Sequence, residues 1–225
     1  MKSPISFNSK VKQGRGTGTG ADYLPWIKAR EINSLGVTHN IVDWKHGRTI
    51  ELLSEGEARL YYILRWDDNV KDIREQYPLE LDTTNDIADK AGIMRVAKGL
   101  DCMTTDLLVT RNGNKLEAYS VKASKTDLTN PRIIEKLWIE KMYWNMKGTP
   151  LKLVYKEDMN SVYADNIRLC VEYYDKSRVH DETSAVKHYI ATKKIKVDME
   201  TAPLNFDELT RIYGGKVWKN CKALP

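Results

Sequence analysis

The chain has 225 residues, of which 41% are hydrophobic and 30% charged, with a formal net charge of +5 and a pI of about 8.9. This composition supports a globular core and a mildly basic surface, which is compatible with a nucleic-acid partner without establishing one. The three cysteines lie far apart and lack CxxC spacing, so neither a disulfide framework nor a zinc site is expected. No apolar run approaches the roughly 18 residues of a membrane helix, and the N-terminus has no apolar signal-peptide core; we expect a cytoplasmic protein with no membrane association.

Residues 1–20 are polar, basic and rich in glycine, a composition typical of a flexible arm. A phosphate-binding loop is the alternative, but the Lys-Ser/Thr pair of a P-loop is missing and no strand precedes the glycines. The interpretation that we favour is a basic arm that lies along a DNA backbone.

Residues 21–150 hold the expected elements of one larger domain. Three short extended segments are expected at 23–27, 40–44 and 48–52. They are followed by a helix from Ser54 to about Trp66 and by a strand from Val70 to Leu79. Thr83 or Thr84 caps a predicted short helix at 85–91, which Gly92 closes.

Residues 103–123 consist of two apolar-rich segments joined by Arg111-Asn112-Gly113-Asn114, a pattern that predicts a β-hairpin. The loop length decides which side chains share a face. A two-residue turn at Asn112-Gly113 would place Asp106 opposite Tyr119, whereas a three-residue loop places it opposite Ser120, on the face of Lys122. A functional role for Asp106 therefore requires an odd-numbered loop or a bulge.

After the hairpin, Asn130-Pro131 predicts a helix start, with a capping Asn and a Pro at the first helical position. This helix should run to Lys147, and Gly148-Thr149-Pro150 gives the best domain boundary. Residues 151–225 are expected to form a small helical or winged-helix domain, with helices at 164–175, 183–192 and 205–212 and a little strand at 194–197.

Asp106 and Lys122 are the first candidate site residues. An Asp before a strand usually lies in a turn or a solvated end, and a Lys at a strand end is often exposed. Together, however, a carboxylate at one strand start and a lysine at the next strand end suit metal-assisted phosphodiester hydrolysis. The carboxylate would hold a divalent cation, and the lysine would position or deprotonate water and neutralise charge on the pentacovalent phosphate.

Glu57 is the second candidate carboxylate. Ser54-x-x-Glu57 is a capping box, which is a sufficient structural explanation in many proteins. Glu57 nevertheless shares helical spacing with Leu60, Tyr61 and Leu64, so it should face the core, where an acid needs a cation or a donor. With Asp106 it would complete an oxygen site for Mg²⁺ or Mn²⁺, with a carbonyl of the 120–122 strand, that of Val121, as the third protein ligand.

Two other features are weaker candidates. Gln76 points its amide either into the same cleft or into solvent. The helix at 132–141 is rich in charges, and its i,i+4 pairs, such as Lys136 with Glu140, are usually solvent-facing support.

Six separated sequence blocks, in this order, resemble the TnsA family, the endonuclease subunits of heteromeric cut-and-paste transposases. They span residues 14–150 and comprise Gly14-Arg15-Gly16 with Tyr23-x-Pro25-Trp26, Leu53-Ser54-x-x-Glu57, Asp68-Asn69-Val70-x-Asp72 through Leu79, Met103-Thr104-Thr105-Asp106, Val121-Lys122, and Glu135-Lys136-Leu137 with Tyr143-Trp144. Beyond residue 150 the similarity is weak; Asn166-Ile167-Arg168-Leu169 is similar to the start of the family's C-terminal winged-helix domain.

The resemblance implies a restriction-endonuclease-like core, an α/β fold with a mixed sheet flanked by helices. It also implies that Glu57, Asp106 and Lys122 match the catalytic Glu, Asp and Lys of the family. The family often has Gln two residues before the lysine, where this chain has Ser120. Ser120 is shorter and offers a hydroxyl in place of an amide, while the main-chain carbonyl of the same strand is still present to bind a metal.

The resemblance further implies a Mg²⁺-dependent nick at the 5′ ends of a transposon in the bacterial cytoplasm, with Mn²⁺ able to substitute. Its partners would be double-stranded DNA at the transposon ends, a TnsB-like DDE transposase that cuts the 3′ ends, and a TnsC-like ATPase. The alternatives are a stand-alone restriction or junction-resolving nuclease, and a non-catalytic DNA-binding or assembly subunit, which Ser120 favours.

Overall fold

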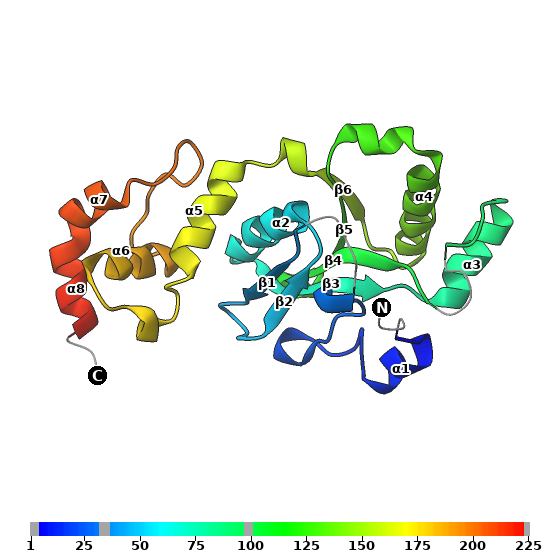
Figure 1. The fold of residues 1–225 in the computed structure, drawn as a ribbon, viewed down its shortest axis with the longest axis horizontal. Coiled ribbons are helices and arrows are strands. Elements are labelled where there is room, and N and C mark those ends of the chain that lie inside the picture. Colours follow the sequence, from blue (N-terminus) through cyan, green and yellow to red (C-terminus); the bar gives the residue numbers. More distant parts are fainter. Residues whose placement is uncertain (1–4, 32–36, 97–100, 223–225) are drawn as a thin grey trace. The chain divides into compact units, whose positions relative to one another are not determined.

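The computed structural model describes residues 5–31, 37–96 and 101–222 (Figure 1). The chain divides into two compact units, Met1–Met159 and Asn160–Pro225. The first unit is a mixed α/β domain, which confirms the predicted fold class. Its main elements are α1 (Phe7–Lys12), β1 (His39–Val42), β2 (Thr49–Leu52), α2 (Glu55–Trp66), β3 (Val70–Pro78), α3 (Leu81–Lys90), β4 (Thr104–Arg111), β5 (Leu116–Lys122), α4 (Pro131–Met146) and β6 (Leu151–Tyr155).

The centre of this unit is a four-stranded sheet in the order β3-β4-β5-β6. The pairs β3–β4 and β4–β5 are antiparallel, whereas β6 pairs with β5 in parallel. The chain reaches β6 through α4, as a parallel connection requires a crossover. The predicted boundary at Gly148–Pro150 is therefore wrong: the Gly/Pro stop ends a helix, and the next five residues still belong to the nuclease-like sheet.

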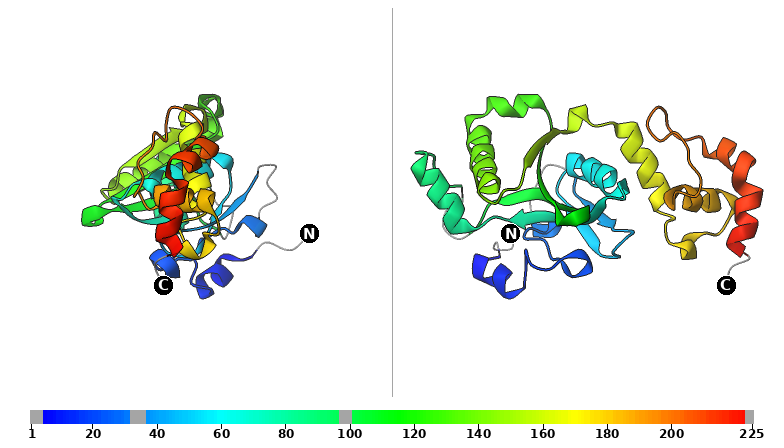
Figure 2. Two further views of the ribbon diagram at one scale, coloured as in Figure 1. Left: turned by 90° about the vertical axis from the view of Figure 1, so that its left-hand side faces the viewer. Right: turned by 180° about the vertical axis from the view of Figure 1, so that it is seen from behind.

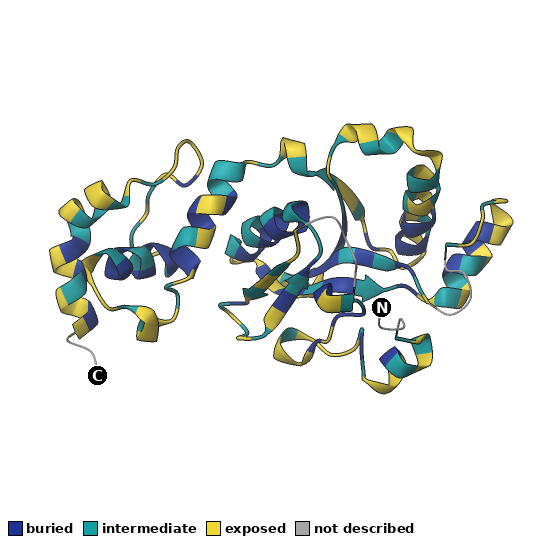
Figure 3. Ribbon diagram, in the orientation of Figure 1, coloured by how far each residue is buried: buried dark blue, intermediate teal, exposed yellow. Residues whose placement is uncertain are grey.

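Two layers cover opposite faces of the sheet, as Figure 1 and the right-hand view of Figure 2 show. On one face, α2 and the β1–β2 hairpin pack their apolar side chains against β3, β4 and β5, with Tyr61 and Leu107 fully buried. On the other face, α3 and α4 pack against Leu108 and Ala118. Figure 3 shows the buried residues of α2 and α4 as stripes, which is typical of amphipathic helices.

The predicted helix starts and hairpin are confirmed with one adjustment. Ser54 caps α2 by accepting the N–H of Glu57, and Asn130 caps α4 by accepting the N–H of Arg132. The hairpin loop is Asn112–Asn114, in which Gly113 and Asn114 have positive φ, so it holds three residues, as a role for Asp106 requires. The helix predicted at 85–91 begins earlier, at Leu81, with Glu80 in the N-cap position and no side-chain capping bond, so the predicted threonine cap is wrong.

The N-terminal segment is folded onto the sheet domain in its described part, residues 5–20, which corrects the expectation of a free arm. Lys10 is buried and its ammonium lies 2.9 Å from a carboxylate oxygen of Asp101. Arg15 is also buried, and its guanidinium makes two 2.7 Å hydrogen bonds to Glu31. Both cations are paired with carboxylates of the protein itself, so they are not free to contact a DNA backbone.

The second unit is helical, with α5 (Ser161–Val171), α6 (Glu182–Ala191), α7 (Phe206–Leu209), a π-helical turn at Thr210–Gly214 and α8 (Gly215–Lys222). The buried Asn166 holds the segment after α6, because its amide donates to the carbonyls of Met199 and Ala202 and accepts the N–H of Leu204. Residues 160–222 contain no strand, so the strand expected at 194–197 and the wing that it would supply are missing. Within the described part of the chain, no helix combines the length and apolarity needed to cross a membrane.

Candidate active site

Asp106 lies where β4 and β5 cease to pair. The register pairs Leu107 with Tyr119, and its continuation places Asp106 opposite Ser120, as the three-residue loop predicts. Instead of a main-chain pair at this point, the carboxylate Oδ2 of Asp106 accepts the N–H of Val121 at 2.7 Å. The side chain is thereby fixed between the two strands.

Glu57 comes to the same region from the first turn of α2. Its side chain is only 6% exposed. One oxygen accepts the hydroxyl of Ser54 at 2.9 Å, and the other accepts the N–H of Leu53 at 2.9 Å and the amide of Gln76 at 3.2 Å. Ser54 caps the helix, but the Glu57 side chain accepts the N–H of Leu53 rather than that of Ser54, so only half of the predicted capping box forms. The inward-facing interpretation of Glu57 is correct.

The two carboxylates influence each other electrostatically. Burial raises the pKa of Glu57 to about 7, and the negative charge of Asp106 adds to this shift. Burial also raises the pKa of Asp106, while the Lys122 ammonium and the N–H of Val121 act in the opposite direction. Burial is the main cause of both shifts, and a bound cation would lower both pKa values because it favours the ionised carboxylates.

Lys122 ends β5, and its positive charge acts on Asp106. Its ammonium donates to the carbonyl of Val121 at 2.9 Å and to the hydroxyl of Ser120 at 3.1 Å. Ser120 is buried, so its hydroxyl serves as a support for the lysine. The structure therefore brings together all the predicted site residues: Glu57, Asp106, Ser120, Val121 and Lys122.

A third acid, Glu140, was expected to face solvent in a pair with Lys136, and this expectation is wrong. Glu140 is 4% exposed, and its carboxyl group accepts the hydroxyl of Thr105, the neighbour of Asp106, at 2.7 Å. Burial, with a contribution from the charge of Asp106, raises its pKa to about 8. The sequence signal was the i, i+3, i+4 spacing of Glu140 with Tyr143 and Trp144, which puts the acid on the apolar stripe of α4.

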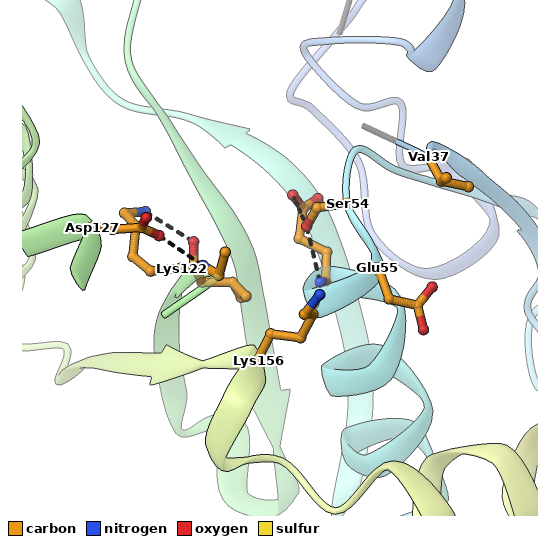
Figure 4. A pocket seen from close by; sticks show the side chains of 10 residues that line it. Val37, Ser54, Glu55, Lys122, Asp127 and Lys156 are labelled. Atoms are coloured by element: carbon orange, nitrogen blue, oxygen red, sulfur yellow. Dashed lines mark hydrogen bonds between the residues drawn. The ribbon is translucent and has the colours of Figure 1, made fainter. Parts of the chain in front are cut away.

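A cavity of about 570 Å³ opens beside these residues. It is lined by the first turn of α2, by Val121–Ala123 at the end of β5, by Asp127 and by Lys156. Lys122 and Lys156 line it from different elements of the chain (Figure 4). Among the residues that the structure describes, Lys156 makes no ion pair, whereas Asp127 accepts the N–H of Ala123 at 2.9 Å.

The donor set fits a hard divalent cation. Across residues 5–31, 37–96 and 101–222 no three His, Cys, Asp or Glu side chains cluster as a metal site. The candidate ligands are two carboxylates and the main-chain carbonyl of Val121, whose oxygen already accepts the Lys122 ammonium at 2.9 Å and has a second lone pair for a cation. Such a set with few protein ligands, all of them oxygens, suits Mg²⁺, which usually retains several waters and uses substrate phosphates as further ligands.

A mixed sheet with helices on both faces, and with two acids and a lysine at the point where a hairpin opens, defines a restriction-endonuclease-like core. The family described as "TnsA-like endonuclease N terminal" matches residues 67–156. The chain is similar to the transposon Tn7 transposition protein TnsA of Escherichia coli, with 36% identity over 168 residues. These matches confirm the resemblance to TnsA. The alignment covers 73% of this chain and 62% of that relative, so the chain spans less than two thirds of the relative's length.

Proposed function

We propose that this protein is a metal-dependent DNA endonuclease that nicks the 5′ ends of a transposon during cut-and-paste transposition. The observation that supports this most strongly is the charge interaction of Asp106 with both Glu57 and Lys122, two residues that line one cavity, in a chain with a TnsA-like endonuclease domain. A TnsB-like DDE transposase and a TnsC-like ATPase are its proposed partners, by similarity to the family.

The carboxylates of Glu57 and Asp106, aided by the carbonyl of Val121, would hold Mg²⁺, and Mn²⁺ would substitute for it. When bound, the cation supplies Lewis-acid activation and neutralises negative charge on the phosphate. Both carboxylates are already oriented by hydrogen bonds to the protein, so little reorganisation would accompany binding.

As an ammonium, Lys122 would supply positive charge to the pentacovalent phosphate and orient the attacking water; only as a neutral amine would it accept the proton of that water instead. Its ammonium is directed by the hydroxyl of Ser120 and the carbonyl of Val121. A fixed charge of this kind stabilises the transition state more than a mobile one, because no reorganisation is needed when the charge develops. Ser120 thus acts through Lys122.

The phosphate backbone of DNA requires further cations along its path. Lys156, which lines the cavity beside Lys122 and the first turn of α2, is the proposed contact to a neighbouring phosphate. In the helical unit, Lys216, Lys219 and Lys222 of α8 are exposed at intervals of three residues, so they follow one side of the helix and would contact phosphates as well.

A non-catalytic assembly subunit is the second candidate, and Ser120 in the position where the family often has Gln is the feature that favours it. A nicking assay on labelled transposon ends, with the partner transposase present, separates the two. We expect Mg²⁺-dependent 5′ nicks from the wild type, and a loss of at least about 100-fold in Asp106→Ala and Lys122→Ala. Asp127→Asn is the matched control, because this carboxylate lines the same cavity but binds only main-chain N–H groups.

Equal nicking by Asp106→Ala and wild type, or full activity in EDTA, would refute the assignment. Absence of 5′ nicks with every protein would favour the assembly subunit. Cleavage of plain duplex DNA without the partner would identify a stand-alone nuclease instead.

A further inference from the structure

The regular alternation of side chains along β3 is interrupted at Gln76. In an undisturbed strand, residues 75 and 77 lie on the same face. Here the carboxylate of Glu75 binds Arg48, beside β2, at 2.6 Å, whereas the ring of Tyr77 packs 5.9 Å from that of Trp144 in α4. The two neighbours of Gln76 thus contact opposite layers of the domain.

The same interruption occurs in β4 at Asp106. Leu107 belongs to the core beneath α2, whereas the hydroxyl of Thr105 accepts the indole N–H of Trp144 at 2.7 Å, in the α4 layer. The strands pair Glu75 with Leu107 and Tyr77 with Thr105, so Gln76 lies directly beside Asp106. Both strands therefore change face at the position of the candidate active site.

The change of face requires an unusual backbone conformation at Gln76, whose φ of +46° lies in the left-handed region. The other two described non-glycine residues with positive φ are Asn114 in the hairpin loop and Lys193 after α6, where left-handed conformations are common. In the interior of a strand such a conformation persists only when its surroundings enforce it, and it occurs preferentially at functional sites.

The surroundings of Gln76 satisfy every polar atom of its amide. The side chain is 2% exposed. Its nitrogen donates to Glu57 at 3.2 Å and its oxygen accepts the hydroxyl of Thr104 at 3.0 Å. The main-chain carbonyl of Gln76 accepts the N–H of Trp26 at 3.3 Å. With this left-handed backbone, the side-chain amide of Gln76 lies between Glu57 of α2 and Thr104 of β4.

We propose that Gln76 is a positioning residue of the two-carboxylate site: its amide holds the Glu57 carboxylate beside Asp106 and thereby sets the affinity for the divalent cation. This inference rests on the proposed function. A neutral donor suits the task, because it orients the carboxylate without cancelling the charge that a cation needs. A lysine would compete with the cation, and an asparagine is one methylene too short to span the same gap.

The test is Mn²⁺ binding measured directly by calorimetry, together with the Mg²⁺ concentration that gives half-maximal nicking. Gln76→Gly removes the amide but tolerates the left-handed backbone. We expect its Kd for Mn²⁺ and its half-maximal Mg²⁺ concentration to rise about 10- to 100-fold, the usual effect of losing a group that orients a metal ligand, with nicking recovered at high Mg²⁺. Asn114→Gly is the matched control: it makes the same backbone change at φ +58° in the exposed loop, and it should bind Mn²⁺ like the wild type.

Gln76→Asn provides a second variant, since Asn also accepts positive φ. It retains an amide that falls short of Glu57, so it should behave like Gln76→Gly, and melting curves establish that both are folded. Wild-type affinity for Mn²⁺ in either folded variant would overturn the positioning role while leaving the proposed nuclease intact. If the wild type itself binds no Mn²⁺ and makes no nicks, the proposed function fails, and the inference fails with it.

Discussion

Replacing Glu140 by glutamine should stabilise the protein, and increasingly so as the pH rises. The buried carboxyl group of Glu140 accepts the hydroxyl of Thr105, a contact that the oxygen of a glutamine amide retains. Its pKa is raised from 4.5 to about 8, first by burial and then by the charge of Asp106. The folded protein therefore keeps a proton that the unfolded chain has already lost above pH 4.5.

The size of the effect follows from proton linkage. The stability contributed by the protonated form is fully present below pH 4.5 and is lost as the pH rises through about 8. Each unit of pKa difference corresponds to about 1.4 kcal/mol, so the wild type should lose roughly 3 to 5 kcal/mol between these limits through this group. Glutamine does not titrate, so the variant should equal the wild type near pH 5 and exceed it by a few kcal/mol at pH 8.5.

Urea unfolding at pH 5, 7 and 8.5, followed by circular dichroism, measures the difference directly. Glu135→Gln is the control, because Glu135 lies on the same helix but is partly exposed and paired with Arg132. Its effect should remain within about 0.5 kcal/mol at every pH. A Glu140→Gln difference that is the same at pH 5 and pH 8.5 would contradict the reasoning, since it would mean that Glu140 titrates normally in the folded state.

Three further substitutions test the packing, the cavity and a helix cap. Gly56→Ala would bring its Cβ within 2.9 Å of a methyl group of Val121, so we expect a loss of about 1–3 kcal/mol in unfolding free energy together with reduced nicking; unchanged melting would show that the first turn of α2 can move. Lys156→Ala should weaken DNA binding and reduce the slope of log K against log salt by about 1. Lys152→Ala is the control and should change the slope less, because the ammonium of Lys152 already binds Glu117 at 2.7 Å. Equal slopes in both variants would exclude the phosphate contact. Asn130→Ala removes the cap of α4 and should cost about 1 kcal/mol with nicking per folded molecule unchanged; lower nicking by the folded variant would show that the start of α4 belongs to the active site.

Local chemistry was sufficient to predict the parts of the fold that depend on short stretches of sequence. The caps at Ser54 and Asn130 mark helix starts because the bonds that they make span two or three residues. The sequence also predicted that a role for Asp106 requires a three-residue hairpin loop, because the loop length alone fixes which residue lies opposite Asp106. The inward direction of Glu57 followed from its helical spacing with buried residues.

What the sequence did not predict depends on partners far away in the chain. Strand β6 is short and half exposed, and its parallel pairing with β5 crosses a whole helix, so the Gly148–Pro150 stop looked like the end of the domain. Arg15 was interpreted as part of a DNA-binding arm, because no local sequence pattern predicts its ion pair with Glu31. The left-handed backbone of Gln76 is likewise invisible in a pattern that predicts a regular strand.

The protonation of Glu140 also bears on the charge that the site presents to a cation. If all three acids were ionised, Lys122 would leave two negative charges in a partly buried space. With Glu140 neutral near pH 7, as its pKa of about 8 implies, Glu57 and Asp106 are opposed by Lys122 alone. The remaining negative charge is most easily compensated by a cation, and binding it would lower the raised pKa of Glu57 by the same linkage. Binding of Mn²⁺ should therefore release protons near pH 7, and calorimetry in buffers of different ionisation enthalpy would measure that release; uptake with no proton release would show that Glu57 is already ionised.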